Sequence, residues 1–212
     1  MVEIVAVAQE IVYVVDDDEG MRKALSRLLR LEGYEVRPFA SAAAFIEGYR
    51  GGDAACVLLD VSMPDTTGLE LQKQLTRAGI HISIVFLTGE GDIAMSVQAI
   101  KSGAVDFLTK PVDDTRLLQT VRSALDHATS RREERAVVEA LVRRHATLTP
   151  REKEVMEHVV AGALNKQIAA TLGTGEQNIK IHRGRVMEKM GVESLPDLVR
   201  AAEKLGLARQ GG

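Results

Sequence analysis

Acidic side chains stand directly after two apolar stretches of the sequence. Asp16, Asp17 and Asp18 follow IVYVV, and Asp60 closes CVLLD. If both stretches are parallel strands, their carboxyl ends share one edge of a sheet, and these carboxylates converge there. Clustered carboxylates repel one another unless they are protonated or neutralised, and Mg²⁺ prefers such oxygen ligands. The spacing therefore predicts a magnesium site.

Two more polar residues end later apolar stretches. Thr88 closes IVFLT, and Lys110 follows DFLT. A carboxylate that accepts a phosphoryl group needs cations and hydrogen-bond donors on the oxygens where negative charge builds up. Taken singly, an acidic triplet suggests a turn or a helix cap, and a lysine before proline suggests a solvated loop. Together with Mg²⁺, these residues predict phosphorylation of a carboxylate.

The residues between 11 and 125 alternate short β-branched stretches with amphipathic helical ones. This alternation is typical of a parallel sheet with helices on both faces, so we predict an α/β domain of the flavodoxin-like (βα)5 type. Helical apolar spacing occurs, for example, at Ala94, Val97 and Ile100. The predicted strands are 11–15, 35–39, 56–59, 82–87 and 105–108.

Length and composition indicate two globular cores. The chain has 212 residues, of which 45% are hydrophobic and 27% are charged. No apolar run approaches the roughly 18 residues that span a bilayer, and the first ten residues lack the pattern of a signal peptide, so we expect a cytoplasmic protein. The single cysteine, Cys56, lies in an apolar run and is expected to be a core residue without chemistry.

The sequence changes character after the α/β domain, to which we assign residues 9–126. Residues 127–146 are charge-rich but keep helical apolar spacing, which predicts a helical linker. Residues 147–209 contain only helical segments and predict a small all-α domain. Thr149, Pro150 and Glu152 form a capping box that begins one helix, and Asn165 is expected to cap the next.

A third helix in this domain, over residues 176–190, completes a helix-turn-helix outline. At 100° per residue, one side carries Ile179, His182, Val186 and Met190, and the opposite side carries Lys180, Ile181, Gly184 and Glu188, flanked by Arg183 and Arg185. Short or donor-bearing groups between guanidinium groups are typical of a helix that reads base edges and contacts phosphates. A solvated amphipathic helix is the alternative.

Residues 11–125 resemble the receiver domain of two-component response regulators, on the strength of the DDD triplet and the strand-end residues given above. The resemblance implies that Asp60 is the phosphoacceptor and that a sensor histidine kinase donates the phosphoryl group. It implies that Asp17, Asp60 and the backbone carbonyl of Ser62 bind Mg²⁺ directly, and that Asp16 acts through a metal-bound water.

The same resemblance gives roles to residues of the fourth and fifth predicted strands. Thr88 and Phe107 would form a switch, and Lys110 would pair with a phosphoryl oxygen. An enzyme with a similar aspartyl phosphate, a phosphatase of the haloacid-dehalogenase kind, is the main rival. It needs a second aspartate two residues after the first, and Ser62 occupies that position. We therefore expect a regulator and not an enzyme.

The strings LTPREKEV, LNKQIA and IKIHRGRVMEKM resemble the LuxR-type helix-turn-helix of the FixJ/NarL class, and SLPDLVRAAEKLG resembles its FixJ branch. The resemblance implies a homodimer on promoter DNA that acts with RNA polymerase. Gly175 and Asn178 depart from the usual Ser and Thr, but a glycine cap costs only about a few tenths of a kcal/mol relative to serine. The expected DNA-binding residues are Asn165, Lys166, Lys180, Ile181, His182, Arg183, Gly184 and Arg185.

These two departures also favour another possibility, a phosphorelay or interaction module whose helical domain no longer binds DNA. Salt-dependent binding to duplex DNA distinguishes the two, because phosphate contacts release counterions.

Overall fold

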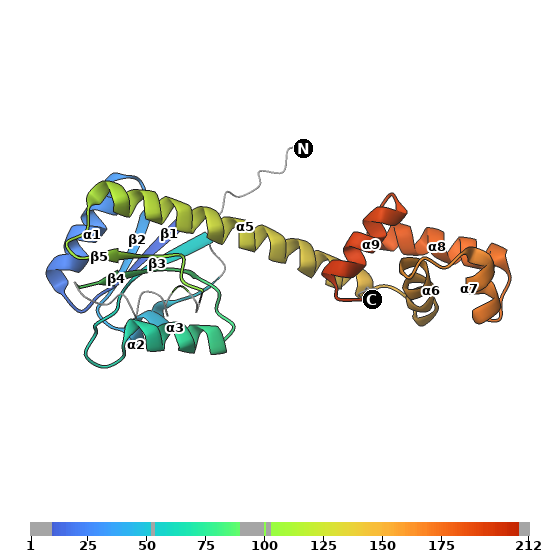
Figure 1. Cartoon of the computed structure of the whole chain (residues 1–212), viewed down its shortest axis with the longest axis horizontal. Coiled ribbons are helices and arrows are strands. Elements are labelled where there is room, and N and C mark those ends of the chain that lie inside the picture. Colours follow the sequence, from blue (N-terminus) through green and yellow to red (C-terminus); the bar gives the residue numbers. More distant parts are fainter. Residues whose placement is uncertain (1–9, 52–53, 90–99, 101–102, 208–212) are drawn as a thin grey trace. The chain divides into compact units, whose positions relative to one another are not determined.

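The computed structural model describes residues 10–51, 54–89, 100 and 103–207 (Figure 1). The chain divides into two compact units, Met1–Arg132 and Glu133–Gly212. Among the described residues, no helix combines the length and the hydropathy that a membrane span requires.

The first unit contains a parallel sheet of five strands in the order β2-β1-β3-β4-β5. This is the flavodoxin-like order, and the predicted fold class is confirmed. Each predicted strand lies within two residues of an observed one. The strands are β1 (Glu10–Val15), β2 (Glu35–Phe39), β3 (Ala54–Asp60), β4 (Ser83–Thr88) and β5 (Asp106–Thr109).

Helices cover both faces of this sheet (Figure 1). Helices α1 (Glu19–Leu31) and α5 (Asp114–Ala146) lie on one face, and α2 (Ala42–Gly48) and α3 (Gly68–Arg77) lie on the other. The helix predicted around Ala94 and Val97 lies outside the described residues. Residues 127–146, predicted as a linker, form the C-terminal part of α5, which continues without a break from the first unit.

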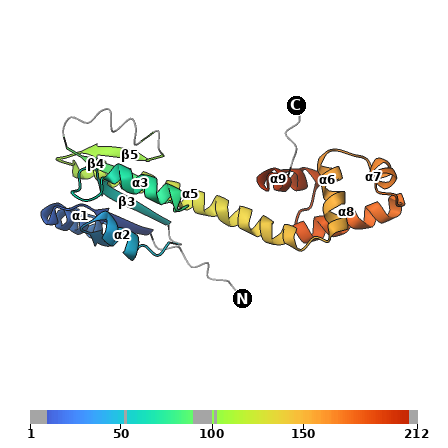
Figure 2. The ribbon, with the colours of Figure 1, turned by 90° about the horizontal axis from the view of Figure 1, so that it is seen from below.

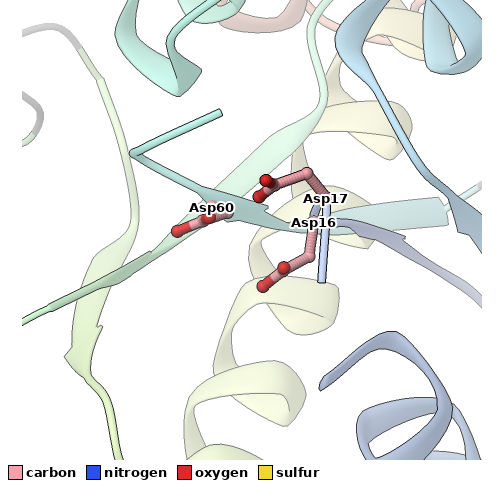
Figure 3. Close-up of side chains that lie close together, drawn as sticks. All are labelled: Asp16, Asp17 and Asp60. Carbon is pink, nitrogen blue, oxygen red and sulfur yellow. The ribbon is translucent and has the colours of Figure 1, made fainter. Parts of the chain in front are cut away.

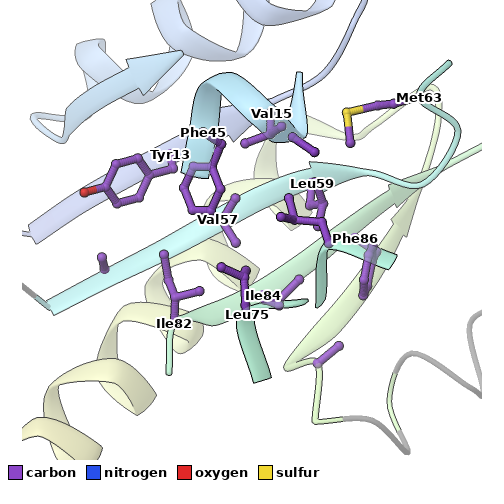
Figure 4. Packing of buried hydrophobic residues seen from close by; sticks show 14 of the residues in the cluster. Tyr13, Val15, Phe45, Val57, Leu59, Met63, Leu75, Ile82, Ile84 and Phe86 are labelled. Carbon is purple, nitrogen blue, oxygen red and sulfur yellow. The ribbon is translucent and has the colours of Figure 1, made fainter. Parts of the chain in front are cut away.

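Two apolar layers hold the sheet between its helices. Side chains alternate along β1, so Tyr13 packs with Phe45 of α2 on one face (Figure 4), while Val12 packs with Leu29 of α1 on the other. Cys56 is fully buried in the second layer, where burial raises the pKa of its thiol. The expectation that Cys56 is a core residue is confirmed.

The strand register brings the acidic residues to one edge of the sheet. Val15 of β1 pairs with Leu59 of β3, so Asp16 and Asp60 follow side by side. The first residue of α3, Gly68, packs against the end of β3. A Cβ atom there would clash with the carbonyl oxygen of Asp60, so only glycine fits without moving the backbone that carries this carboxylate.

The second unit is helical, as predicted, and its helices enclose a third apolar cluster, which includes Val155, Ile168, Ile179 and Leu198. Helix α8 contacts both α6 and α7 (Figure 2). The four helices that follow α5 are α6 (Pro150–Val160), α7 (Asn165–Thr171), α8 (Glu176–Met190) and α9 (Leu195–Lys204).

One predicted helix cap is confirmed and another is wrong. Thr149 and Glu152 form the predicted capping box of α6. Asn165, however, does not cap α7, because it is the first helical residue and Leu164 precedes it as the cap. The Oε1 atom of Gln167 accepts a hydrogen bond of 2.8 Å from the N–H of Leu164, the cap residue itself. The Asn165 side chain instead accepts a hydrogen bond from Arg183 of α8.

Candidate acidic site and nucleic-acid interface

Three carboxylates converge at the carboxyl edge of the sheet (Figure 3). Asp16 and Asp17 follow β1, Asp60 ends β3, and one oxygen from each lies within 4.8 Å of those of the other two. Asp16 and Asp60 are buried, whereas Asp17 is exposed. Hard divalent cations prefer such oxygen ligands, so this donor set fits a cation that is reached from the solvent side.

Lys110 brings a positive charge to the same place from the loop after β5. Its Nζ lies 2.7 Å from Oδ2 of Asp16 and 3.1 Å from Oδ1 of Asp60. The lysine thus contacts both buried carboxylates, although it is 50 residues away from Asp60 in the sequence. The predicted convergence of these strand ends is what the structure shows.

The pKa values of Asp60 and Lys110 follow from their burial and from the hydrogen bonds between them. Burial raises the pKa of the Asp60 carboxyl, while the hydrogen bonds from Lys110 and from the backbone N–H of Ser62 oppose that rise. Burial also lowers the pKa of Lys110, but its hydrogen bonds to Asp16 and Asp60 outweigh burial, so the pKa is raised overall. Lys110 therefore stays positively charged at neutral pH.

The two predicted switch residues lie on neighbouring strands. Thr88 is buried at the end of β4, and its hydroxyl donates a hydrogen bond of 3.2 Å to the Gly89 carbonyl oxygen. Phe107 is half-buried on β5 and packs against the apolar layer that contains Phe86, its partner in the strand register. Their roles in a switch stay predictions, as does the ligand role of the Ser62 carbonyl.

Three hydrogen bonds hold the loop between β1 and α1. Nη1 of Arg22 donates a hydrogen bond of 2.6 Å to the carbonyl oxygen of Asp16. The Asp16 carboxylate accepts a hydrogen bond of 2.8 Å from the N–H of Asp18, and the Asp18 carboxylate caps α1 at Met21. Asp16 and Asp18 therefore fix the loop, and the exposed Asp17 carboxylate stays on the side of Asp16 and Asp60.

The predicted recognition helix, α8, has the two sides expected of it. Ile179, Val186 and Met190 are buried in the cluster of the second unit, and His182 is half-buried. The opposite side is exposed, and Ile181 keeps 46% of its surface accessible. An exposed aliphatic side chain among cationic ones suits contact with a thymine methyl group and with phosphates. The exposed residues on this side are Lys180, Ile181, Gly184 and Glu188, and Arg185 is exposed beside them.

The remaining predicted DNA-binding residues are mostly held by contacts within the protein. Nη1 of Arg183 donates a hydrogen bond of 2.7 Å to Oδ1 of Asn165, so α8 is tied to the start of α7. Lys166 is exposed next to Asn165. Within the described part of the chain, the buried Nδ1 atom of His182 has no hydrogen-bond partner.

A buried ion pair that the sequence reasoning missed lies at the other end of α8. Nζ of Lys189 lies 2.6 Å from Oε2 of Glu152, which is only 2% exposed. The hydrogen bond from Lys189, together with that from the Thr149 backbone, lowers the pKa of Glu152 to about 2. The only signal in the sequence was the capping box, which explains Glu152 locally without pointing to Lys189.

Comparison with protein families divides the chain as the structure does. Residues 12–122 match the response regulator receiver domain, and residues 146–202 match the luxR family of bacterial regulatory proteins.

Known relatives align with this chain across both matched segments. The chain is 46% identical over 203 residues to nodulation protein W of Bradyrhizobium diazoefficiens, covering 96% of this chain and 89% of the relative. It is 40% identical to the transcriptional regulatory protein FixJ of Azorhizobium caulinodans, with 93% of each chain covered. Among solved structures, the response regulator StyR is 42% identical with a TM-score of 0.82, covering 93% of this chain and all of that one.

Proposed function

The chain belongs to the two-component response regulators that join a receiver domain to a LuxR-type DNA-binding domain, and we propose from this premise which of its residues carry out phosphorylation-dependent control of transcription. Asp60 accepts the phosphoryl group from a sensor histidine kinase. The observation that carries this assignment is the position of Asp60 at the end of β3, beside two further carboxylates and 3.1 Å from Lys110.

The chemistry follows from the charges around Asp60. One of its carboxylate oxygens attacks phosphorus, the bond to the donor breaks, and the donor leaves with the bonding electrons. Negative charge spreads over the phosphoryl oxygens, and the Lys110 ammonium stabilises it because its raised pKa keeps the group protonated. The lysine is already in place before the reaction, so little reorganisation is needed.

The acidic cluster would hold Mg²⁺. Asp17 and Asp60 would bind the ion directly, together with the Ser62 carbonyl oxygen, and Asp16 would act through a water. When bound, Mg²⁺ supplies positive charge to the phosphoryl oxygens. The protein residues offset the repulsion among the three carboxylates, since Lys110 contacts two of them and Arg22 fixes the Asp16 backbone.

Phosphorylation is read out by Thr88 and Phe107. The Thr88 hydroxyl donates a hydrogen bond of 3.2 Å to the carbonyl oxygen of the next residue, Gly89, and it can turn to a phosphoryl oxygen on Asp60. Phe107 is half-buried and can move further into the apolar layer when Thr88 turns.

The DNA-binding function belongs to the exposed side of α8. Lys180, Ile181 and Gly184 would face base edges, Arg185 and Lys166 would contact phosphates, and Arg183, His182 and Asn165 would complete the interface. A homodimer formed on phosphorylation would bind pseudo-palindromic half-sites and act with RNA polymerase. Because promoters lie in the bacterial cytoplasm, the proposal requires a cytoplasmic protein.

We assign these functions to a receiver over residues 9–126, a linker over 127–146 and a DNA-binding domain over 147–209. The family matches over 12–122 and 146–202 support this division.

The DNA-binding assignment is tested by titrating duplex DNA with Lys180→Ala protein, with Arg143→Ala as a control that loses the same charge from the exposed surface of α5. Lys180→Ala should weaken binding about tenfold or more, and Arg143→Ala should change it less than about twofold. Equal DNA affinity of the Lys180 variant and the wild type would contradict the assignment of α8 as the helix that reads DNA.

A further inference from the structure

The C-terminal end of the recognition helix is held by a side chain of α5. Nη1 of Arg144, in the last turn of α5, donates a hydrogen bond of 3.1 Å to the carbonyl oxygen of Met190, the last residue of α8. The final carbonyl groups of a helix lack partners within it and carry partial negative charge, so a guanidinium group there is favourable in both respects.

Gly191 makes room for this contact. It ends α8 in the left-handed conformation, with φ 64°, which glycine adopts without strain. A Cβ atom at this position would lie 2.7 Å from Nη1 of Arg144 and would displace the guanidinium group. The helix end and the arginine are therefore matched to one another.

Thr147, in the turn after α5, and Glu152, in the first turn of α6, hold the same end of α8 a second time. Lys189 donates to Oε2 of Glu152 at 2.6 Å and to the carbonyl oxygen of Thr147 at 3.3 Å. Glu152 is itself fixed by its hydrogen bond of 2.8 Å from the Thr149 N–H. The last turn of α8 is thus attached on two sides to the segment that leaves α5.

We infer that Arg144 is a positioning residue for DNA recognition, through which α5 sets the placement of α8. The inference rests on the proposed DNA-binding role of α8. Arg144 contacts α8 at Met190, six residues or about 9 Å along the helix from Gly184 and ten residues or about 15 Å from Lys180. A small displacement at Met190 therefore shifts the exposed side that is proposed to face the bases.

The test uses the full-length protein and compares Arg144→Ala with Arg143→Ala. Arg143 is the adjacent residue on α5; its side chain is 73% exposed, and its closest carboxylate, that of Glu139, is 3.9 Å away. Both variants lose one positive charge, and alanine favours the helix in both. Affinity is measured for a genomic fragment selected by the wild type and for random duplex DNA of equal length, over a range of salt concentrations.

We expect Arg144→Ala to bind the selected fragment about tenfold more weakly, the effect of losing about one base contact. Its affinity for random DNA and its salt dependence should stay within about twofold of the wild type. Arg144→Lys should recover part of the loss, since it keeps the charge and one donor for the Met190 carbonyl. Circular dichroism checks that each variant keeps its helix content.

Three outcomes overturn the inference. If Arg144→Ala binds the selected fragment as Arg143→Ala does, Arg144 does not position α8. If it binds both DNAs more weakly and its salt slope falls by about one, Arg144 is a phosphate contact instead. If the wild type binds no DNA in any state, the proposed function fails and the inference fails with it, which separates this outcome from the first two.

Discussion

The Nζ atom of Lys110 lies 3.1 Å from Oδ1 of Asp60, so a positive charge stands beside the proposed phosphoacceptor. The same ammonium lies 2.7 Å from Asp16, so a single cation serves two buried carboxylates. Because the pKa of Lys110 is raised by these hydrogen bonds, the charge is present before any phosphoryl group arrives. The predictions for this site follow from that arrangement.

Replacing Asp60 with asparagine should abolish phosphorylation by acetyl phosphate. The asparagine amide keeps the shape of the site, but the nucleophilic carboxylate is gone. Phosphoprotein gel electrophoresis or intact mass measures the result. Asp65→Asn, which changes an exposed carboxylate in the loop after β3, is the matched control and should be labelled like the wild type. Full labelling of the Asp60 variant would mean that another residue accepts the phosphoryl group.

Lys110→Ala should slow phosphorylation by about 100-fold, the usual cost of removing one preorganised group that stabilises charge in the transition state. Rates are taken from the growth of the phosphorylated species at saturating Mg²⁺. Lys73→Ala removes an exposed lysine of α3 and should leave the rate unchanged. A Lys110 variant that reacts as fast as the Lys73 variant would show that the lysine contributes only to folding.

The metal requirement is tested with the acidic triplet after β1. Chelation of Mg²⁺ should stop phosphorylation, and Asp17→Asn should raise the Mg²⁺ concentration for half-maximal rate by about tenfold or more. Asp18→Asn loses the same charge but keeps the cap of α1, because asparagine caps a helix as well as aspartate does. Equal Mg²⁺ dependence in the two variants would argue against Asp17 as a ligand.

The acidic site was predictable because it depends on strand ends. Once β1 and β3 are recognised from their apolar runs, a parallel register brings Asp16 and Asp60 together without further information. The contact between Arg144 and Met190 joins residues 46 positions apart through one long side chain, and no local pattern marks it. Asn165 was predicted wrongly for a related reason, since it is the first residue of α7 and its side chain contacts Arg183, 18 positions along the chain.

The buried pair of Glu152 and Lys189 gives a prediction about pH. The pKa of Glu152 is lowered from 4.5 to about 2 by the hydrogen bond from Lys189 and then by that from Thr149. Because the folded state prefers the ionised form, the pair stabilises the second unit above pH 4.5, and this stabilisation is lost as the pH falls toward 2.

A carboxyl-carbon NMR titration measures this pKa directly. The Glu152 signal should titrate near pH 2 in the wild type, and Lys189→Ala should move its midpoint upward toward 4.5. Lys180→Ala, a matched loss of charge on the exposed side of the same helix, should leave the midpoint where it is. A wild-type midpoint near 4.5 would show that the ion pair does not form in solution.

The dependence of DNA binding on Asp60 phosphorylation is the most direct measurement. Wild type and Asp60→Asn are each mixed with a pool of genomic fragments, with and without beryllofluoride and Mg²⁺, and the retained fragments are compared by mobility shift. We predict that particular fragments are retained by activated wild type and that activation has no effect on the Asp60→Asn protein. Equal retention by wild type with and without beryllofluoride, or equal activation of both proteins, would contradict control of DNA binding through Asp60.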